Sequence, residues 1–238
     1  MSTTESANTP SLPAALSERT LTTLISALDL ETVEDVALTS AMSADPVGRL
    51  RVLRGGPIDK AVTVDLVVPP IGLDSHMIFA FTGSDSAVPH FTLDSVYGGE
   101  YYAMHLDLIP RADLAVHLEY LDAAYLPLTS LLEDAWRIEG VSPAAIGPRQ
   151  RALMSPWMVV CRADAAAFGT LTGTVDAYLE HWLTLVDKGV PAVGEDPAAR
   201  DRANRANLFS PAVDPVWAQV TRLLGAEQSE RVRGELIV

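Results

Sequence analysis

The stretch VPHFTLDSVYGGEYYAMHLDLIP, residues 88–110, decides the fold, because it predicts two β-strands joined by a Gly-Gly dipeptide. Glycine tolerates the positive φ angles of a two-residue hairpin turn, and such a turn pairs Tyr97 with Glu100. Counting back from the turn opposes Val96 to Tyr101, Asp94 to Ala103, Thr92 to His105, and His90 to Asp107. The two strands are therefore predicted to run antiparallel.

Four ionisable side chains share one face of this hairpin. Side chains alternate along a strand and directly opposed residues lie on the same face, so the set is His90, Asp94, His105 and Asp107. Two interpretations follow. The polar face can look into water, as one side of an antiparallel hairpin commonly does. Alternatively, it forms the wall of a pocket in which carboxylates and imidazoles are spaced for proton transfer.

The patterns on both sides of the hairpin predict the architecture. Runs rich in Val, Leu, Ile and Phe predict further strands at 48–54, 61–68, 73–82 and 155–162. Apolar residues at helical spacing predict helices at 13–28, 32–42, 114–136 with an interruption near Pro127, 176–185, 197–207 and 215–224. Successive strands with short connections form an antiparallel meander, and helices before and after it can cover both faces. We therefore predict an α+β protein, an α/β/α sandwich with a central antiparallel sheet.

If helices cover both faces of the sheet, they also cover the polar side of the hairpin. Side chains beneath a helical layer are removed from water, and an unpaired buried charge costs several kcal/mol by order of magnitude. A cavity between the sheet and the helices removes this conflict. The sandwich therefore favours the pocket interpretation.

Composition limits the domain organisation and the classes of partner. The chain has 238 residues, of which 48% are hydrophobic, and its net charge is −14. We predict a loose polar tail at 1–12 and a single domain at 13–238, since nothing in the composition marks a linker. The negative charge argues against nucleic acid and anionic membranes as partners, because both attract clustered Lys and Arg.

Familiar cofactor motifs are absent from the sequence. It contains no phosphate-binding loop, no dinucleotide fingerprint, and neither H-E-x-x-H nor G-x-S-x-G. Cys161 is the single cysteine, so no cysteine-based metal cage can form. A two-histidine metal site at His90 and His105 lacks recognisable third and fourth ligands. We expect no bound cofactor or metal, and the absence of a signal pattern or spanning apolar run predicts a cytoplasmic protein.

Three segments carry a resemblance to a known family. They are PHFTLDSVYGGEYYAMHLDLIPRADLAVHLEYLDAAY (89–125), SPWMVVCR (155–162) and RDRANRANLFSPAVDPVWAQVTRLLG (200–225). Together they resemble the red chlorophyll catabolite reductases and, more distantly, the ferredoxin-dependent bilin reductases. The resemblance implies an α/β/α sandwich that holds an open-chain tetrapyrrole between the sheet and the C-terminal helices. It also implies single-electron reduction by external ferredoxin, with no metal or flavin in the enzyme.

The resemblance places two acidic pocket residues. The strand carboxylate of the family falls on Asp94, the proton donor to the substrate radical, and the acid before the last helix falls on Asp214, which assists from the helix side. From local sequence alone, Asp214 also reads as a helix cap. His105 and His90 lie near Asp94 on the predicted hairpin and are candidates to tune its proton affinity.

The resemblance also gives further residues that are candidates to contact the substrate. Members of the family often have a histidine on the preceding strand. The position in this sequence that aligns with that histidine is Met77, and the nearest histidine, His76, is one residue away and therefore on the opposite face of the strand. The 155–162 segment adds Trp157 and Arg162, since a guanidinium can pair with a substrate carboxylate.

Three functions remain open at this point. The leading prediction is an oxidoreductase that reduces a linear tetrapyrrole or a related conjugated ring compound with electrons from ferredoxin, although the net charge of −14 counts against docking an acidic ferredoxin. The first alternative is cofactor-independent oxidation or rearrangement of a small aromatic metabolite in the same pocket. The second is a non-catalytic ligand-binding protein. A homodimer is possible for each.

Overall fold

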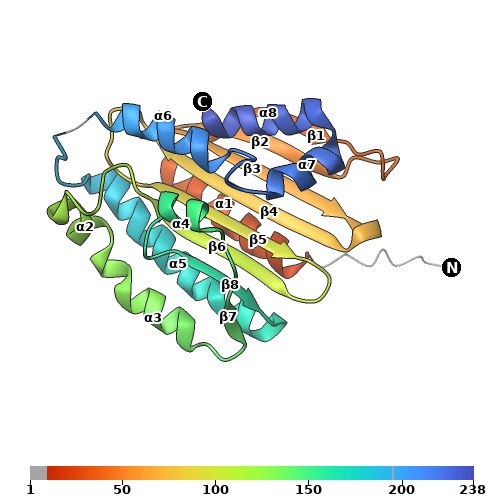
Figure 1. Ribbon diagram of the computed structural model, residues 1–238, viewed down its shortest axis with the longest axis horizontal. Helices are drawn as coiled ribbons and strands as arrows, with labels where there is room; N and C mark the ends of the chain where they lie inside the picture. Colours follow the sequence, from red (N-terminus) through yellow and green to blue (C-terminus); the bar gives the residue numbers. More distant parts are fainter. Residues whose placement is uncertain (1–9, 195) are drawn as a thin grey trace.

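The computed structural model describes residues 10–194 and 196–238, and within them eight strands form one antiparallel sheet (Figure 1). The predicted tail lies outside the described residues for positions 1–9. The strand order is β1-β2-β3-β4-β5-β6-β8-β7. The bounds are β1 (Glu31–Leu38), β2 (Gly48–Gly55), β3 (Ile58–Val68), β4 (Leu73–Thr82), β5 (His90–Tyr97), β6 (Tyr102–Ile109), β7 (Val141–Pro143) and β8 (Val159–Ala163).

Helices cover both faces of the sheet (Figure 1). One face carries α1 (Leu12–Leu28), α5 (Ala165–Lys188) and, packed on α5, the run α2 (Leu118–Ala124), the 3-10 turn η2 (Leu126–Leu128) and α3 (Thr129–Arg137). The other face carries α4 (Pro148–Leu153), α6 (Pro197–Leu208), α7 (Val216–Leu224) and α8 (Ala226–Ile237). A short 3-10 turn, η1 (Pro69–Ile71), joins β3 to β4. The predicted α/β/α sandwich is confirmed.

Two apolar cores lie on the two faces of the sheet. The α1 and α5 side contains, among others, Leu24, Phe91, Leu106, Phe168 and Trp182. The α6 to α8 side contains, among others, Leu50, Val62, Phe81, Trp217 and Leu236. Because side chains alternate along a strand, most of the large apolar residues of the β5–β6 hairpin enter the first core, while His90, Asp94, His105 and Asp107 face the second helical layer.

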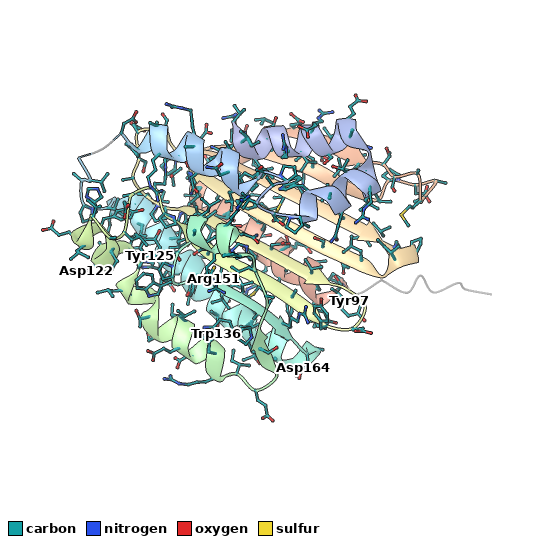
Figure 2. The ribbon with its side chains drawn as sticks, in the orientation of Figure 1. Tyr97, Asp122, Tyr125, Trp136, Arg151 and Asp164 are labelled. Carbon is teal, nitrogen blue, oxygen red and sulfur yellow. The ribbon has the colours of Figure 1, made fainter. Side chains whose placement is uncertain are left out.

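The register of the hairpin differs from the prediction. Tyr97 pairs with Tyr102 rather than with Glu100, so four residues form the turn and Asp94 pairs with His105. Only Gly99 of the two glycines has a positive φ, and the two-residue turn that needs two positive φ angles does not form (Tyr97 is labelled in Figure 2). The pairing shifts by two residues, and since strands repeat every two residues the predicted face is unchanged.

The predicted helix at 32–42 is wrong, because the segment up to Leu38 belongs to the edge strand β1 (Glu31–Leu38) and the rest is turn and loop. The side chains of β1 are mostly exposed, and two of its acidic residues bind basic partners outside the strand. Asp35 pairs with Arg49 on β2 at 2.6 Å, and Glu34 pairs with Arg231 on α8 at 2.9 Å. The cross-strand charge pair and the ladder with β2 outweigh the local helical spacing.

The C-terminal half contains elements that periodicity did not predict. Helix α5 begins at Ala165, well before the predicted 176, since Asp164 caps it by accepting the Ala167 N–H at 2.9 Å. The short elements α4 and β7 and the polar helix α8 were also missed, and β8 begins at Val159. The break near Pro127 and the start of α7 after Pro215 agree with prediction. None of the described helices is long and apolar enough to cross a membrane.

Candidate active site

Two small adjoining cavities open between the polar face of the hairpin and the helices above it. Their volumes are about 90 and 80 Å³. Both are lined by Asp94, Met77, Val216 and Trp217, and we call the pair the Asp94 cavity. The carboxylate therefore lies where the sheet meets the segment that enters α7.

Strands β5 and β6 position the two ionisable groups at the floor of the Asp94 cavity. Asp94 and His105 are directly opposite in the ladder, so their β-carbons lie about 4.5–5.5 Å apart by ordinary antiparallel geometry. Asp94 Oδ1 and His105 Nε2 are both shielded from water and have no hydrogen-bond partner among the described residues. Unpaired buried polar atoms are costly, and a pair of them facing a cavity marks a site with unused bonding capacity.

Burial sets the protonation states of these two groups. Removal from water raises the pKa of Asp94 to about 7, the nearby Asp214 carboxylate adds to this rise, and His76 opposes it. Burial also lowers the pKa of His105 to about 4. Near neutral pH the imidazole is thus uncharged, while the carboxyl group exists in both protonated and ionised forms. A carboxyl group poised in this way can donate a proton.

Asp214 reaches the Asp94 cavity from the connection between α6 and α7. Its carboxylate accepts the Val216 N–H at 3.0 Å and the side-chain amide of Gln150 at 3.2 Å. Burial raises the pKa of Asp214, while the Val216 bond lowers it. Pro215 is the N-cap residue of α7, and Asp214, one residue before it, bonds the first N–H of the helix while it also presents a second acid to the cavity.

Apolar side chains form the remaining walls. Met77 lies directly opposite Asp94 on β4, at the position that the family resemblance matched. The other large apolar groups come from β4, α4 and the helical layer, namely Phe79, Met154, Leu208, Phe209 and Trp217. Sequence reasoning did not select these residues or Gln150. The one available signal was the position of Phe209 and Trp217 within the 200–225 segment, close to Asp214 in the chain.

His90 lies outside the Asp94 cavity, in a buried polar network at the far end of β5. Its Nδ1 accepts the Thr82 N–H at 3.0 Å, so its Nε2 carries the proton and donates to Asp201 on α6 at 2.7 Å. Burial lowers the pKa of His90 to about 4. The residue is therefore a neutral link between the sheet and α6.

His76 faces the opposite side of the sheet, since it pairs with Ser95 while its neighbour Met77 pairs with Asp94. Its ring bonds Asp65 at 3.0 Å and Asp74 at 2.7 Å. Burial is the largest single effect and lowers its pKa, but the two carboxylates leave the pKa of His76 above its usual value. This imidazole belongs to a carboxylate cluster below α1 and does not line the Asp94 cavity.

Trp157 and Arg162 also lie away from the Asp94 cavity. The Trp157 indole N–H donates to Thr129 at 3.0 Å and its ring packs on Tyr125, on the α2 and α3 side (Tyr125 is labelled in Figure 2). The Arg162 guanidinium is exposed and stacks 4.4 Å above the Tyr101 ring. Among the predicted residues, the structure thus brings together Asp94, His105, Asp214 and Met77.

Asp107 is the fourth ionisable group of the hairpin face, and it fixes a chain segment next to the Asp94 cavity. It is fully buried and accepts both the N–H and the hydroxyl of Ser155, at 3.0 and 2.5 Å. Burial raises its pKa to about 7, and the Ser155 bonds partly oppose this. The contact anchors the chain beside Met154, which lines the Asp94 cavity. In the described part of the chain, no three His, Cys, Asp or Glu side chains are grouped to hold a metal ion.

The chain is similar in sequence to two known proteins that carry the same name. The chain is 27% identical to red chlorophyll catabolite reductase of Hordeum vulgare over 194 residues, which cover 71% of this chain and 90% of the relative. It is 32% identical over 92 residues to the chloroplastic red chlorophyll catabolite reductase 1 of Oryza sativa subsp. japonica, covering 35% of this chain and 27% of that protein. No family model matches.

The fold comparison points the same way. A crystal structure of phytochromobilin synthase from tomato, in complex with biliverdin, superposes with a TM-score of 0.71 at 16% identity, covering 92% of this chain and 80% of that one. The likeness at this identity concerns the fold. Together with the sequence relatives, it confirms the predicted resemblance to red chlorophyll catabolite reductases and bilin reductases.

Proposed function

We propose that this protein is an oxidoreductase that reduces a linear tetrapyrrole, with Asp94 as the proton donor and an external one-electron donor of the ferredoxin type. The relatives named above are reductases, and the solved structure of similar fold holds biliverdin. The observation that carries the proposal is the pairing of Asp94 with a neutral His105 at the floor of the Asp94 cavity. Together these facts favour proton-coupled reduction of a bound ligand.

The chemistry follows from the two groups. Reducing one double bond of a conjugated ring system consumes two electrons and two protons, and each added electron makes the substrate more basic. Protonated Asp94 delivers a proton to the reduced substrate and is left as a carboxylate. Because His105 is directly opposite Asp94 in the ladder and its Nε2 is unpaired among the described residues, its imidazole is placed to pass the replacement proton to the more basic carboxylate. Asp214 is the second carboxyl group within the Asp94 cavity.

The test is an anaerobic absorbance titration with biliverdin and with an opened chlorophyll catabolite, followed by addition of a reduced ferredoxin system. We expect a saturable spectral shift and then bleaching of the bound pigment. Asp94→Asn should retain the shift and slow the bleaching by at least about 100-fold, the usual contribution of a general acid. Asp65→Asn is the matched control, because Asp65 lies on the same sheet but bonds His76 on the other face. If Asp94→Asn binds the pigment and still reduces it at the wild-type rate, Asp94 is not the proton donor.

One observation favours a second candidate function. The Asp94 cavity is below the range of about 300–1,000 Å³ typical of sites for larger ligands. Its present size suits a small aromatic metabolite, on which the same residues would catalyse cofactor-independent oxidation or rearrangement. Consumption of oxygen with such a compound, and no spectral shift with either pigment, would select this alternative. Binding without turnover of any kind would instead indicate a ligand-binding protein.

A further inference from the structure

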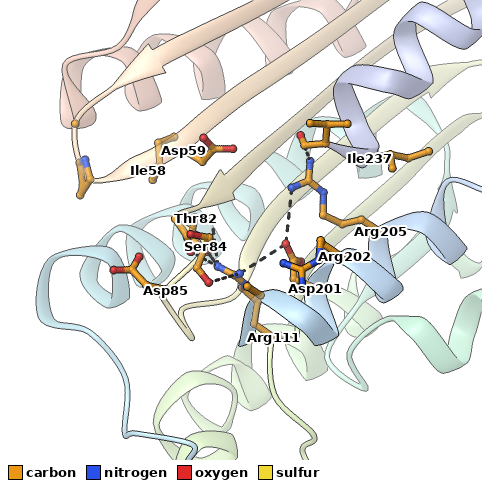
Figure 3. Close-up of a pocket in the computed structure, with 15 residues that line it drawn as sticks. Ile58, Asp59, Thr82, Ser84, Asp85, Arg111, Asp201, Arg202, Arg205 and Ile237 are labelled. Atoms are coloured by element: carbon orange, nitrogen blue, oxygen red, sulfur yellow. Dashed lines mark hydrogen bonds and ion pairs between the residues drawn. The ribbon is translucent and has the colours of Figure 1, made fainter. Parts of the chain in front are cut away.

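A second, larger cavity lies at the other end of the sheet from Asp94. Its volume is about 730 Å³, and it shares no lining residue with the Asp94 cavity. Its walls are the turn between β2 and β3, the segments after β4 and after β6, one side of α6 from Ala198 to Arg205, and the end of α8 (Figure 3). We call it the arginine cavity, because Arg111, Arg202 and Arg205 all line it.

Two of these guanidiniums are built into the wall. Arg111 and Arg205 are 1% and 7% exposed. Arg111 donates to the carbonyls of the Thr82–Ser84 segment, and Arg205 donates to the backbone oxygens of Leu236 and Val238 at 2.8 and 2.7 Å. The Arg111 contacts hold the loop after β4 against the segment that follows β6, and the Arg205 contacts hold the end of α8 against α6. The cavity is therefore a formed site with fixed positive groups.

Among the described residues, the two buried guanidiniums have only one carboxylate within ion-pair distance. Arg111 and Arg205 share this single carboxylate, Asp201, at 3.6 and 3.7 Å (Figure 3). The closest contact of that carboxylate, at 2.7 Å, is to the neutral His90. The three ionised side chains thus carry one excess positive charge. Arg111 Nε is also buried without a partner among the described residues. Buried excess charge is costly, and an anion in the cavity would reduce that cost.

Arg202 supplies a free group that a ligand can reach. It lies one residue after Asp201 on α6, it is exposed, and it forms no hydrogen bond or ion pair with any described residue. A guanidinium pairs with a carboxylate through two parallel hydrogen bonds, which gives direction as well as attraction. Arg202 is therefore the recognition group of the cavity.

The remaining wall limits the class of ligand. Ile58 and Ile237 give the cavity an apolar side. Two acids stand on the rim: Asp59 is paired with Arg54 at 3.0 Å, and Asp85 is exposed to water. These acids disfavour a highly charged anion such as a polyphosphate. A single carboxylate attached to an apolar body fits both the charges and the walls.

We propose that the arginine cavity binds a small organic carboxylate, whose charged group pairs with Arg202 and whose apolar body packs on Ile58 and Ile237. The site is separate from the Asp94 cavity, and the proposal does not depend on reductase activity. Helix α6 connects the two, because it contributes Arg202 and Arg205 to one cavity and Leu208 to the other.

The test uses 2-naphthoate as the probe and its uncharged amide, 2-naphthamide, as the matched compound. Titration of the full-length, ¹⁵N-labelled protein followed by NMR should give saturable shifts at residues 83–85 and 198–205. Arg202→Gln should weaken binding by at least about tenfold, as loss of a charged hydrogen-bonded partner does. Arg222→Gln is the matched control, because Arg222 is an exposed helical arginine that forms no ion pair with any described residue and lies outside both cavities. The amide should bind about tenfold more weakly than the acid.

Each opposite result overturns the proposal. Absence of saturable binding would mean that the cavity is not a carboxylate site. Shifts confined to residues around Asp94 would place the probe in the other cavity. Equal affinity of Arg202→Gln and Arg222→Gln, or of the acid and the amide, would remove the role of the guanidinium. Equally tight binding of inorganic phosphate would remove the role of the apolar wall.

Discussion

At the scale of single residues, burial decides which ionisable groups are poised for chemistry. The same desolvation that raises the pKa of Asp94 to about 7 lowers the pKa of His105 to about 4. The uncharged form of each group is favoured because water no longer stabilises the charge. A protonatable carboxyl group and a neutral imidazole therefore occupy directly opposed positions on β5 and β6.

The pH dependence of reduction should report the Asp94 carboxyl group. Because protonated Asp94 is the donor, we expect turnover to fall as the pH rises through about 7. The Asp214 carboxylate raises the pKa of Asp94, so Asp214→Asn should move this fall to lower pH. Steady-state rates across the pH range, with saturating electron donor, measure the midpoint. A midpoint that stays in place or moves to higher pH would contradict the coupling.

Asp107 allows a stability test at the same scale. Its pKa is about 7 in the folded protein and near 4 in the unfolded chain, so between these values the folded state binds more protons. Rising pH therefore destabilises the wild type through this group. Asp107→Asn lacks the titration, and its stability relative to wild type should increase from pH 4 to pH 7 by a few kcal/mol, by order of magnitude. Urea unfolding at the two ends of this range measures the difference; a constant difference would show that Asp107 does not titrate there.

At the scale of elements, α6 is tied to the sheet by charge rather than by an apolar stripe. Asp201 contacts His90 on β5 at 2.7 Å and also faces Arg111 and Arg205. The Arg205 guanidinium stacks 3.8 Å above the Phe81 ring on β4. A helix with so polar a sequence needs such contacts to dock, and they place Leu208 and Phe209 over the Asp94 cavity.

Removing the central carboxylate should loosen this helix. Asp201→Asn leaves two buried guanidiniums without an anion, and we expect a loss of about 3–5 kcal/mol in the free energy of unfolding. Asp35→Asn is the control, because its ion pair with Arg49 on the edge strand is exposed and should be worth about 0–1 kcal/mol. Denaturant unfolding of both variants gives the comparison. Equal losses would mean that Asp201 contributes no more than a surface pair.

At the scale of the whole molecule, the helical layer closes over a site that is too small for the proposed substrate. The Asp94 cavity measures about 90 and 80 Å³ in its two parts. The floor belongs to the central strands, while the roof comes from α7 and the residues before it. Tetrapyrrole binding therefore requires the roof to move while the sheet stays in place.

Hydrogen exchange should detect this movement. We expect biliverdin to change amide exchange in residues 209–224, which include α7, and to leave β3 and β4 unchanged because their ladder lies within the sheet. Mass spectrometry of the free and pigment-bound protein measures both regions. Unchanged exchange in the roof together with saturable binding would place the pigment elsewhere on the molecule.

The sequence by itself determined the sandwich and the polar face of the hairpin. Asp94 and His105 share a face whether the turn has two residues or four, because strand side chains repeat every two residues. The edge strand β1 and the polar helix α8 could not be read locally, since their partners lie on other elements.

Only the tertiary structure decided which polar groups meet the cavity. His90 bonds Asp201, 111 residues away, and Asp107 bonds Ser155, 48 residues away, so neither shares the cavity with Asp94. Local periodicity assigns a residue to a face of its own strand, but it carries no information about which distant side chain covers it. Burial, and with it the protonation state of each group, depends on that distant cover.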